Sequence, residues 1–467
     1  MPDNKPFIFL TFAIFLLAIS PFLLAEGMFF DGIYYCAISH NLAQGIGSFW
    51  QPQMETTTQF YGQPPLAFGL QALFYKVLGN SLYIDKIYSV TTFLITALLI
   101  LSVWKMSGKK WTTGWFPLLL WLCFSLVLWA LPNNLLESSM TMFVIASLLC
   151  FLLYQKRKKW YWIVFSGVML CLAFFTKGVT GVFPLVMPLG HALLFRDKKW
   201  GGLLKEIGLM SAGLLVPILI LFLSSPEACH YMAKYVQVQL MDAFRNTYWI
   251  TVKTRWFIVL RFLLNSVPHL LIFLLLWLYT RKIKQKIIAQ TYIQQRKIFW
   301  FLIITGLCGI IPIMISLKQR EFYMLAALPF FALAWALLLE NVVQQLIAKI
   351  SVKNNRIFLW ISLLLVATGI GSIAVHKNTF SRDRQLLADI HQLLPYIPDR
   401  ATISMDKSMF EEWKLYPYFA RYKSISLDVD NEYDLLLVRD STMLQNYNSH
   451  YSLKCQTKTL LLYGKNE

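Results

Sequence analysis

The chain has 467 residues, of which 57% are hydrophobic, 16% are aromatic and only 14% are charged. Soluble domains usually carry about 25% charged residues, so this composition excludes an ordinary soluble enzyme and favours a protein that crosses a membrane several times. The formal net charge of +19 comes from short clusters of lysine and arginine, without a basic helix, a zinc pattern or an aromatic RNA-binding motif, so we expect no nucleic-acid partner. The seven cysteines are scattered without a Cys-x-x-Cys pair, which predicts neither a disulfide framework nor a metal cluster.

Apolar runs of spanning length recur along the chain. The first covers residues 7–25, and it is longer than the apolar part of a signal peptide, so we predict a retained helix. About eleven such runs predict an all-α polytopic membrane protein in contact with the lipid bilayer. They lie near residues 7–25, 84–104, 113–131, 138–154, 161–176, 179–195, 206–224, 257–279, 299–317, 322–340 and 357–375. The two runs that flank Lys177 are also compatible with one broken segment.

Basic residues occupy every second connection between the predicted spans. These connections are 105–110, 155–159, 196–205, 281–297 and 348–356. Because cytoplasmic connections carry an excess of lysine and arginine, all five lie in the cytoplasm if the N-terminus does. The outer segments 26–83 and 225–256, and the C-terminal region, then lie on the periplasmic or extracellular face.

Residues 376–467 are more polar and predict a small soluble α/β domain on that outer face. Helical spacing over residues 384–398 precedes β-like runs at 401–405, 424–429, 433–440 and 457–464. The predicted division is a transmembrane domain of residues 1–375 and a soluble domain of residues 376–467. The soluble domain contains no glycine-rich phosphate loop, so we expect it to support the structure or to guide a substrate.

Several charged residues lie at the outer ends of the predicted spans, where topology does not explain them. Charges near hydrocarbon are costly and are therefore functional candidates. The candidates are the carboxylates Asp31 and Glu137, the cations Lys177, Arg245, Lys318 and Arg320, and the neighbouring Tyr323. A carboxylate can take a proton from a hydroxyl or an amine, whereas lysine and arginine bind phosphate. This set predicts group transfer from a lipid phosphate, although Asp31 as a solvated loop residue and Lys177 as a headgroup anchor are simpler alternatives.

The first outer segment contains two stretches that are typical of interfacial helices. Asp31 begins a tyrosine-rich stretch directly after the first span. Pro64-Pro65 then fixes an extended turn before an apolar stretch that can lie in the interface plane. We expect these stretches to shape a substrate cavity, with the candidate residues Tyr35, Tyr61, Gln63, Pro64 and Pro65.

Four motifs in this order resemble the bacterial branch of the family 39 glycosyltransferases, which includes protein O-mannosyltransferases and the lipid A aminoarabinose transferase. They are Asp31-Gly32 with Tyr35, Ile38, Leu42 and Gly45; Gln63-Pro64-Pro65-Leu66; Thr176-Lys177-Gly178 with Pro184 and Pro188; and Lys318 with Tyr323, Leu328 and Pro329. The resemblance covers roughly residues 10–345. Two positions depart from it, because Gly32 stands where the family usually has a glutamate and Gln63 stands where it has a lysine.

The resemblance implies a GT-C fold and the transfer of a sugar, with inversion, from a polyprenyl (undecaprenyl) phosphate donor. The acceptor is then a glycolipid such as lipid A, or a protein, at the outer face of a bacterial inner membrane. Asp31 and Glu137 are the implied catalytic residues, Asp31 as the general base. The implied phosphate-binding residues are Lys177, Arg245, Lys318, Arg320 and Tyr323. The resemblance is compatible with a divalent metal, but no cluster of ligand residues in the sequence requires one.

Three other hypotheses stay open on the sequence. A transporter or flippase of lipid-linked sugars predicts charges at mid-span and an internal repeat, whereas this chain places its unexplained charges at helix ends. An O-antigen ligase or polymerase usually concentrates its cations in a large, late outer loop, whereas here the first loop carries the signal. An inactive relative is the third alternative, because of Gly32 and Gln63.

Overall fold

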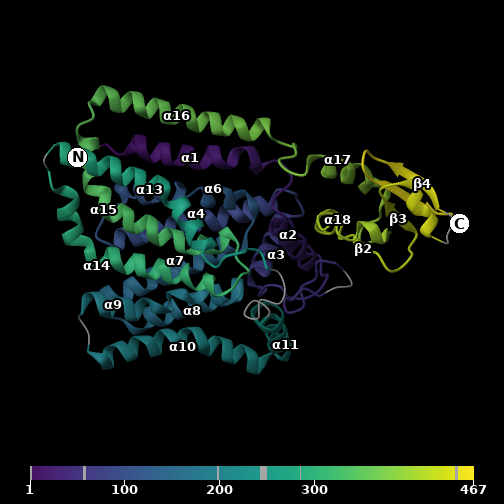
Figure 1. Ribbon diagram of the computed structural model, residues 1–467, viewed down its shortest axis with the longest axis horizontal. Helices are drawn as coiled ribbons and strands as arrows, with labels where there is room; N and C mark the ends of the chain where they lie inside the picture. The colour runs from purple at the N-terminus through teal and green to yellow at the C-terminus, as the bar shows by residue number, and fades with distance from the viewer. Residues whose placement is uncertain are drawn as a thin grey trace.

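The computed structural model describes residues 3–55, 59–196, 199–241, 250–283, 285–447 and 451–466. A bundle of long helices makes up most of the molecule, and a small sheet domain near the C-terminus lies beyond one end of it (Figure 1). The N-terminus lies at the opposite end of the bundle (Figure 1).

Long apolar helices form the bundle, because a helix satisfies every backbone polar group within its own segment in hydrocarbon. They are α1 (Lys5–Leu23), α4 (Ile84–Met106), α7 (Leu136–Arg157), α8 (Trp160–Lys177), α10 (Trp200–Ser224), α13 (Phe257–Lys282), α14 (Ile287–Cys308), α15 (Leu328–Ala348) and α16 (Val352–Val375). The shorter helices are α2 (Phe30–Ala43), α3 (Leu66–Leu78), α5 (Trp115–Leu122), α6 (Ser125–Ala130), α9 (Met187–Phe195) and α11 (Pro226–Tyr235). The 3-10 and π turns are η1 (Trp111–Thr113), η2 (Leu131–Asn133), η3 (Gly178–Val186), η4 (Val236–Met241), η5 (Ile311–Ile315) and η6 (Glu321–Ala327).

The chain is a multi-pass membrane protein. Among the described residues, nine helical segments are long and apolar enough to cross a membrane, or ten if the bent pair Trp111–Leu122 and Ser125–Asn133 is one span. One of the nine, Trp160–Phe195, turns back on itself. A Cβ on Gly181 would lie 2.8 Å from the Ala173 backbone, whereas a continuous helix would separate these residues by about 12 Å. The two runs predicted around Lys177 are therefore two helical segments that fold back on each other, and the nine or ten candidate spans of the described residues compare with about eleven predicted.

Helix α14 begins earlier than the apolar pattern predicts. The sequence predicts a connection through residue 297 and a span from 299, but the helix starts at Ile287. Lysine, arginine and glutamine are good helix formers, so the helix includes residues 287–297 of the predicted basic connection.

Two contacts hold lysines of basic connections against neighbouring helices at one end of the bundle. The Lys109 Nζ lies 2.6 Å from a carboxylate oxygen of Glu340, close to connection 348–356. The Lys297 Nζ lies 3.5 Å from the carbonyl oxygen of Phe195, beside connection 196–205. Lysine and arginine thus gather at the end that does not carry the sheet domain, as the alternation in the sequence predicts.

The C-terminal domain contains a five-stranded sheet with the order β2-β1-β3-β5-β4. Strand β1 pairs parallel to β2 and β3, and β5 pairs antiparallel to β3 and β4. The elements are α17 (Arg384–Leu393), η7 (Leu394–Tyr396), β1 (Thr402–Met405), η8 (Lys407–Met409), α18 (Leu415–Lys423), β2 (Ser426–Asp428), β3 (Leu435–Val438), η9 (Ser441–Asn446), β4 (Tyr451–Gln456) and β5 (Leu461–Lys465). The predicted helix and four strand runs are confirmed, whereas α18 and the polar edge strand β4 are absent from the prediction.

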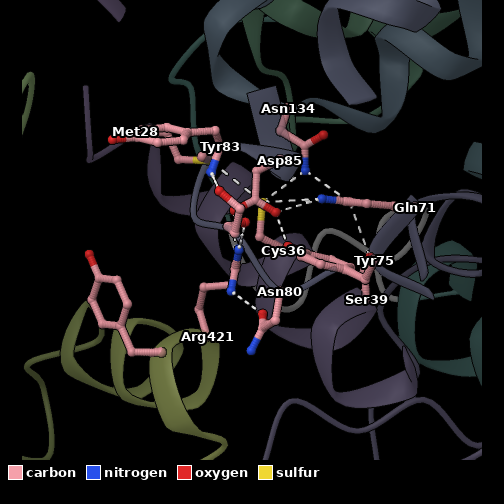
Figure 2. A network of polar contacts seen from close by, with 12 residues as sticks. Met28, Cys36, Ser39, Gln71, Tyr75, Asn80, Tyr83, Asp85, Asn134 and Arg421 are labelled. Carbon is pink, nitrogen blue, oxygen red and sulfur yellow. Dashed lines mark hydrogen bonds and ion pairs between the residues drawn. The ribbon is translucent and has the colours of Figure 1, made fainter. Parts of the chain in front are cut away.

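A buried polar network joins α18 of this domain to the bundle (Figure 2). The Arg421 Nε donates to a carboxylate oxygen of Asp85 at 2.9 Å, and only 2% and 3% of the two side chains are exposed. The guanidinium also donates to the Asn80 side chain and to the Ser81 carbonyl oxygen. The other Asp85 oxygen accepts a hydrogen bond of 2.9 Å from Gln71 on α3. The domain is therefore anchored by a charge pair that is shielded from water.

The same network reaches α2 and the corner between α6 and α7. The Asn134 Nδ2 donates to the Cys36 Sγ on α2 and to the Gln71 Oε1, both at 3.0 Å (Figure 2). Ser39, one turn beyond Cys36, donates to the same Gln71 oxygen at 3.1 Å. Four segments distant in the sequence thus share one set of hydrogen bonds.

A second polar contact joins the first outer segment to the sheet domain. The buried Glu55 accepts a hydrogen bond of 3.1 Å from the backbone N–H of Leu427 in β2. Burial raises the pKa of Glu55, that hydrogen bond lowers it and the negative charge of Asp428 raises it, and the net pKa is about 7. This contact therefore depends on the protonation state of one carboxyl group.

Candidate active site

A buried ion pair lies at the outer end of α7 and α8. The Lys177 Nζ is 3.0 Å from the Glu137 Oε1, and 7% and 1% of the two side chains are exposed. Helix α8 ends here because Gly178 adopts a φ of +73°, and the hydroxyl of Tyr235 occupies the space of a Cβ. The Thr-Lys-Gly corner thus requires glycine, and it fixes Lys177 at the last position of the helix.

Asp31 lies in the first turn of α2, and the corner before α7 positions it. The Asn133 Oδ1 accepts a hydrogen bond of 2.7 Å from the N–H of Phe29, directly before α2. A Cβ at position 32 would lie 2.0 Å from the Asn133 carbonyl oxygen. Gly32 is therefore needed for this close approach, and the glutamate that the family usually has there would not fit this packing.

Asp31 is half-buried among charges of both signs. Burial raises its pKa, and the positive charges of Lys177, Arg320 and Lys318 oppose that rise. The pKa of the buried Tyr35 is also raised, by burial first and then by the negative charges of Asp31 and Glu137. A carboxylate in this setting is a stronger base than a fully solvated one.

Lys177 connects these carboxylates to the fourth motif. Its Nζ lies 5.9 Å from the ring centre of Tyr35 and 5.4 Å from that of Tyr323. Lys318 is half-buried, and its Nζ donates to the Gln239 Oε1 at 2.7 Å. Arg320 is exposed. The first, third and fourth motifs therefore meet in space, as their shared chemistry predicts.

A cavity of about 350 Å³ opens beside this cluster, between η3 and η5. Its polar lining includes Gln63, Lys177, Gln239, Lys318 and Tyr323. Its remaining lining is largely apolar and includes Val179, Val182, Phe183, Pro312, Ile313 and Ile315. A cavity that is cationic at one part and apolar at another suits a molecule with an anionic head and a hydrocarbon tail.

The second motif contributes a backbone hydrogen-bond acceptor and packing contacts to the site. The Gln63 carbonyl oxygen accepts a hydrogen bond of 2.6 Å from the hydroxyl of Tyr231, and the ring of Tyr231 packs 5.4 Å from that of Tyr61. Pro64 and Pro65 are buried directly before α3. The candidate Arg245 lies outside the described residues.

Four residues of the site escape prediction from the sequence. They are Asn133, Tyr231, Tyr235 and Gln239. The pair Asn133-Asn134 within an apolar stretch is the one visible signal, because amides there need partners. Within the part of the chain that the structure describes, no three His, Cys, Asp or Glu side chains gather closely enough to hold a metal ion.

Comparison with known proteins supports the family resemblance. The model of the family described as dolichyl-phosphate-mannose-protein mannosyltransferase matches residues 62–226. The structure of ArnT from Cupriavidus metallidurans bound to undecaprenyl phosphate superposes with a TM-score of 0.65 at 12% identity, over 98% of this chain and 97% of that chain. The chain has the GT-C fold.

Two further structures agree with this fold. The apo state of the same ArnT has a TM-score of 0.65 at 13% identity, over 98% of this chain and 96% of the other. The Archaeoglobus fulgidus oligosaccharyltransferase, in a complex with Zn and sulfate, has a TM-score of 0.50 at 12% identity, over 98% of this chain and 73% of that one. A sequence search finds no match among curated proteins. The GT-C fold that the resemblance implies is confirmed, and the family match over residues 62–226 includes the second and third of the four motifs.

Proposed function

We propose that this protein is a membrane glycosyltransferase that takes its sugar from a polyprenyl-phosphate donor, with undecaprenyl phosphate as the carrier. The observation that supports this best is a half-buried carboxylate, Asp31, whose pKa is affected by the charges of Lys177, Lys318 and Arg320, together with a cavity with an apolar wall that Lys177 and Lys318 line. The acceptor in this proposal is a glycolipid of the lipid A type or a protein hydroxyl.

Asp31 acts as the general base in the proposed step. The acceptor oxygen attacks the anomeric carbon of the sugar from the side opposite to the carrier, and its proton passes to the Asp31 carboxylate. The bond between the anomeric carbon and the phosphate oxygen breaks, and the polyprenyl phosphate leaves with the electron pair. Attack from the opposite face inverts the configuration of the sugar.

Cations around the cavity stabilise the phosphate as negative charge develops on it. Lys177 and Lys318 line the cavity, and Arg320 is close enough to influence Asp31. The family usually has a phosphate-binding lysine at the position of Gln63, and these cations supply the positive charge in its stead. The ArnT structure with undecaprenyl phosphate has the same fold, which supports a carrier of this chemistry here.

Glu137 has a positioning role in this proposal rather than contact with the substrate. Its side chain is almost completely buried and is paired with Lys177. Leaving either partner alone in this site would cost about 3–5 kcal/mol, so Glu137 holds the Lys177 ammonium at a fixed place. No step of the proposal uses a metal ion.

We place the active site on the outer face of a bacterial inner membrane. The basic connections lie at the opposite end of the bundle, and cytoplasmic connections are the basic ones. The N-terminus is then cytoplasmic, and the soluble domain of residues 376–467 is periplasmic or extracellular and packs against α2. Donor and acceptor meet where α2 lies at the edge of the bilayer.

Mass spectrometry of the lipid-linked sugars, glycolipids and glycoproteins tests the proposal in cells that carry the wild-type protein, Asp31→Asn or a deletion. We expect one acceptor to lose the mass of a sugar in both the variant and the deletion, while the polyprenyl-phosphate sugar accumulates. Asp430→Asn, an exposed position of the sheet domain, serves as the matched control and should behave as the wild type.

The same experiment separates the transporter alternative. Normal acceptors in the Asp31→Asn cells, with the donor redistributed between the two leaflets, would reject the transferase. Kinetics of the purified protein address the cations: Lys318→Gln should raise the donor KM more than it lowers kcat. An unchanged donor KM would remove Lys318 from the phosphate site.

A further inference from the structure

A second cavity lies at the basic end of the bundle, far along the helices from the candidate active site. It has a volume of about 270 Å³ and is formed by the first half of α1, the second half of α4, and α5. Its lining is almost entirely apolar and includes Phe12, Phe15, Phe93, Leu94, Trp111 and Trp121. On a face that meets the bilayer, a groove of this size and lining is filled by an apolar group rather than by water.

The groove opens towards the surroundings of the bundle. Phe12, Leu94 and Trp111 line it and are 47%, 45% and 48% exposed. In the membrane, this face of α1 and α4 meets hydrocarbon, so the groove is open to the acyl chains of the bilayer. The occupant that the bilayer itself supplies is one acyl chain of a lipid.

Cationic side chains lie at one end of the groove. The Lys105 Nζ is exposed and lies 5.3 Å from the ring centre of Trp111, which lines the groove. Lys110 is exposed and directly precedes that tryptophan. Lys109 pairs with Glu340 and is therefore already neutralised. A tryptophan beside lysines at the end of a membrane helix marks the level of the lipid headgroups.

We propose that this groove binds one anionic phospholipid of the leaflet at the basic end of the bundle. Its acyl chain lies between α1, α4 and α5, and its phosphate lies against Lys105 beside the Trp111 ring. Lysines in this connection are expected for topology alone, but topology does not require an apolar groove that ends at them. Basic pockets between membrane helices are a known mode of binding for anionic headgroups.

Native mass spectrometry of the full chain in detergent tests this, by titration with phosphatidylglycerol and with phosphatidylcholine of identical acyl chains. We expect the wild type to retain one phosphatidylglycerol more tightly than phosphatidylcholine. Loss of one lysine near a charged headgroup removes about 1 kcal/mol, so Lys105→Gln should weaken phosphatidylglycerol about fivefold and leave phosphatidylcholine nearly unchanged. Lys158→Gln removes an exposed lysine from another basic connection and should have no effect.

A second pair of variants tests the groove independently of the charge. Ala97→Phe fills the lining on α4 and should abolish retention of phosphatidylglycerol, whereas Leu98→Phe, on the 61% exposed face of the same helix, should not. Equal affinity of the wild type for the two lipids would overturn the proposal. So would normal binding in Ala97→Phe, because the lysines would then act only as a general surface charge. If the wild type formed dimers without bound lipid, and Ala97→Phe dissociated them, the groove would instead bind a second copy of the chain.

Discussion

The buried pair between Arg421 and Asp85 makes a quantitative prediction about how the sheet domain is held. Arg421→Met keeps most of the volume of the side chain but leaves the Asp85 carboxylate without a cation in a site that is 3% exposed. Removal of one partner of a buried ion pair costs about 3–5 kcal/mol. We expect that amount to be lost from the free energy of opening of the contact between α18 and the bundle.

Hydrogen exchange of the backbone amides measures this opening free energy locally. The amides of α18 should exchange about two to three and a half orders of magnitude faster in Arg421→Met, because each 1.4 kcal/mol is a factor of ten. Amides at the middle of α7, inside the bundle, should change little. This contrast distinguishes undocking of the domain from unfolding of the whole chain.

The double variant Arg421→Met with Asp85→Asn provides the control. An asparagine keeps an oxygen that can accept from Gln71, which donates to Asp85 at 2.9 Å, but it removes the uncompensated charge. We expect the double variant to recover about 1–3 kcal/mol relative to Arg421→Met alone. If Arg421→Met changed the exchange of α18 by less than about tenfold, or if the double variant were no better, the pair would not be what holds the domain.

Two further predictions concern the candidate active site, and a third concerns the contact of Glu55 with the sheet domain. Gly32→Ala should lower kcat about 100-fold in a folded protein, because its Cβ would lie 2.0 Å from the Asn133 carbonyl oxygen; a normal kcat would mean that this corner does not position the base. Arg320→Gln removes a cation that lowers the pKa of Asp31, and the pKa of Asp31 should therefore rise. The acid limb of the profile of kcat/KM against pH should then move to higher pH. A limb that moved to lower pH, or stayed in place, would contradict the assignment of Asp31 as the base. The Glu55 carboxyl has a pKa of about 7, against 4.5 for an ordinary glutamate. Its protonated form therefore stabilises the docked domain, and this contribution is complete below about pH 4.5. About 3 kcal/mol of the free energy of docking is lost as the pH rises through 7. Glu55→Gln should remove this slope from the exchange of β2 amides between about pH 5 and 8, and an unchanged slope would assign the titration to another group.

Prediction from the sequence succeeds where the signal is periodic or electrostatic. The apolar runs predict the helices, because the bilayer requires both their length and their composition. Asp31, Lys177 and Lys318 stand out as candidates because charges at helix ends on the non-basic face have no topological explanation, and in the structure the two lysines lie close enough to affect the pKa of Asp31.

Packing partners are beyond such reasoning, because nothing local in the sequence marks them. Gln239 becomes part of the site only through its contact with Lys318, and it precedes that residue by 79 positions. The role of Arg421 depends on a contact with Asp85 over 336 positions. Helix α18, which carries it, is short and contains Pro417, so neither its existence nor its buried arginine is visible before the chain is folded.

The two departures from the family pattern favour a modified site over an inactive one. At position 32, the missing side chain leaves room for the Asn133 carbonyl oxygen, so glycine serves the packing that orients Asp31. At position 63, the backbone oxygen of Gln63 keeps a structural contact with Tyr231, and its side chain faces a cavity that Lys177 and Lys318 also line. A site that had lost its function would have no need to keep a carboxylate and these cations together near hydrocarbon, where each uncompensated charge costs several kcal/mol.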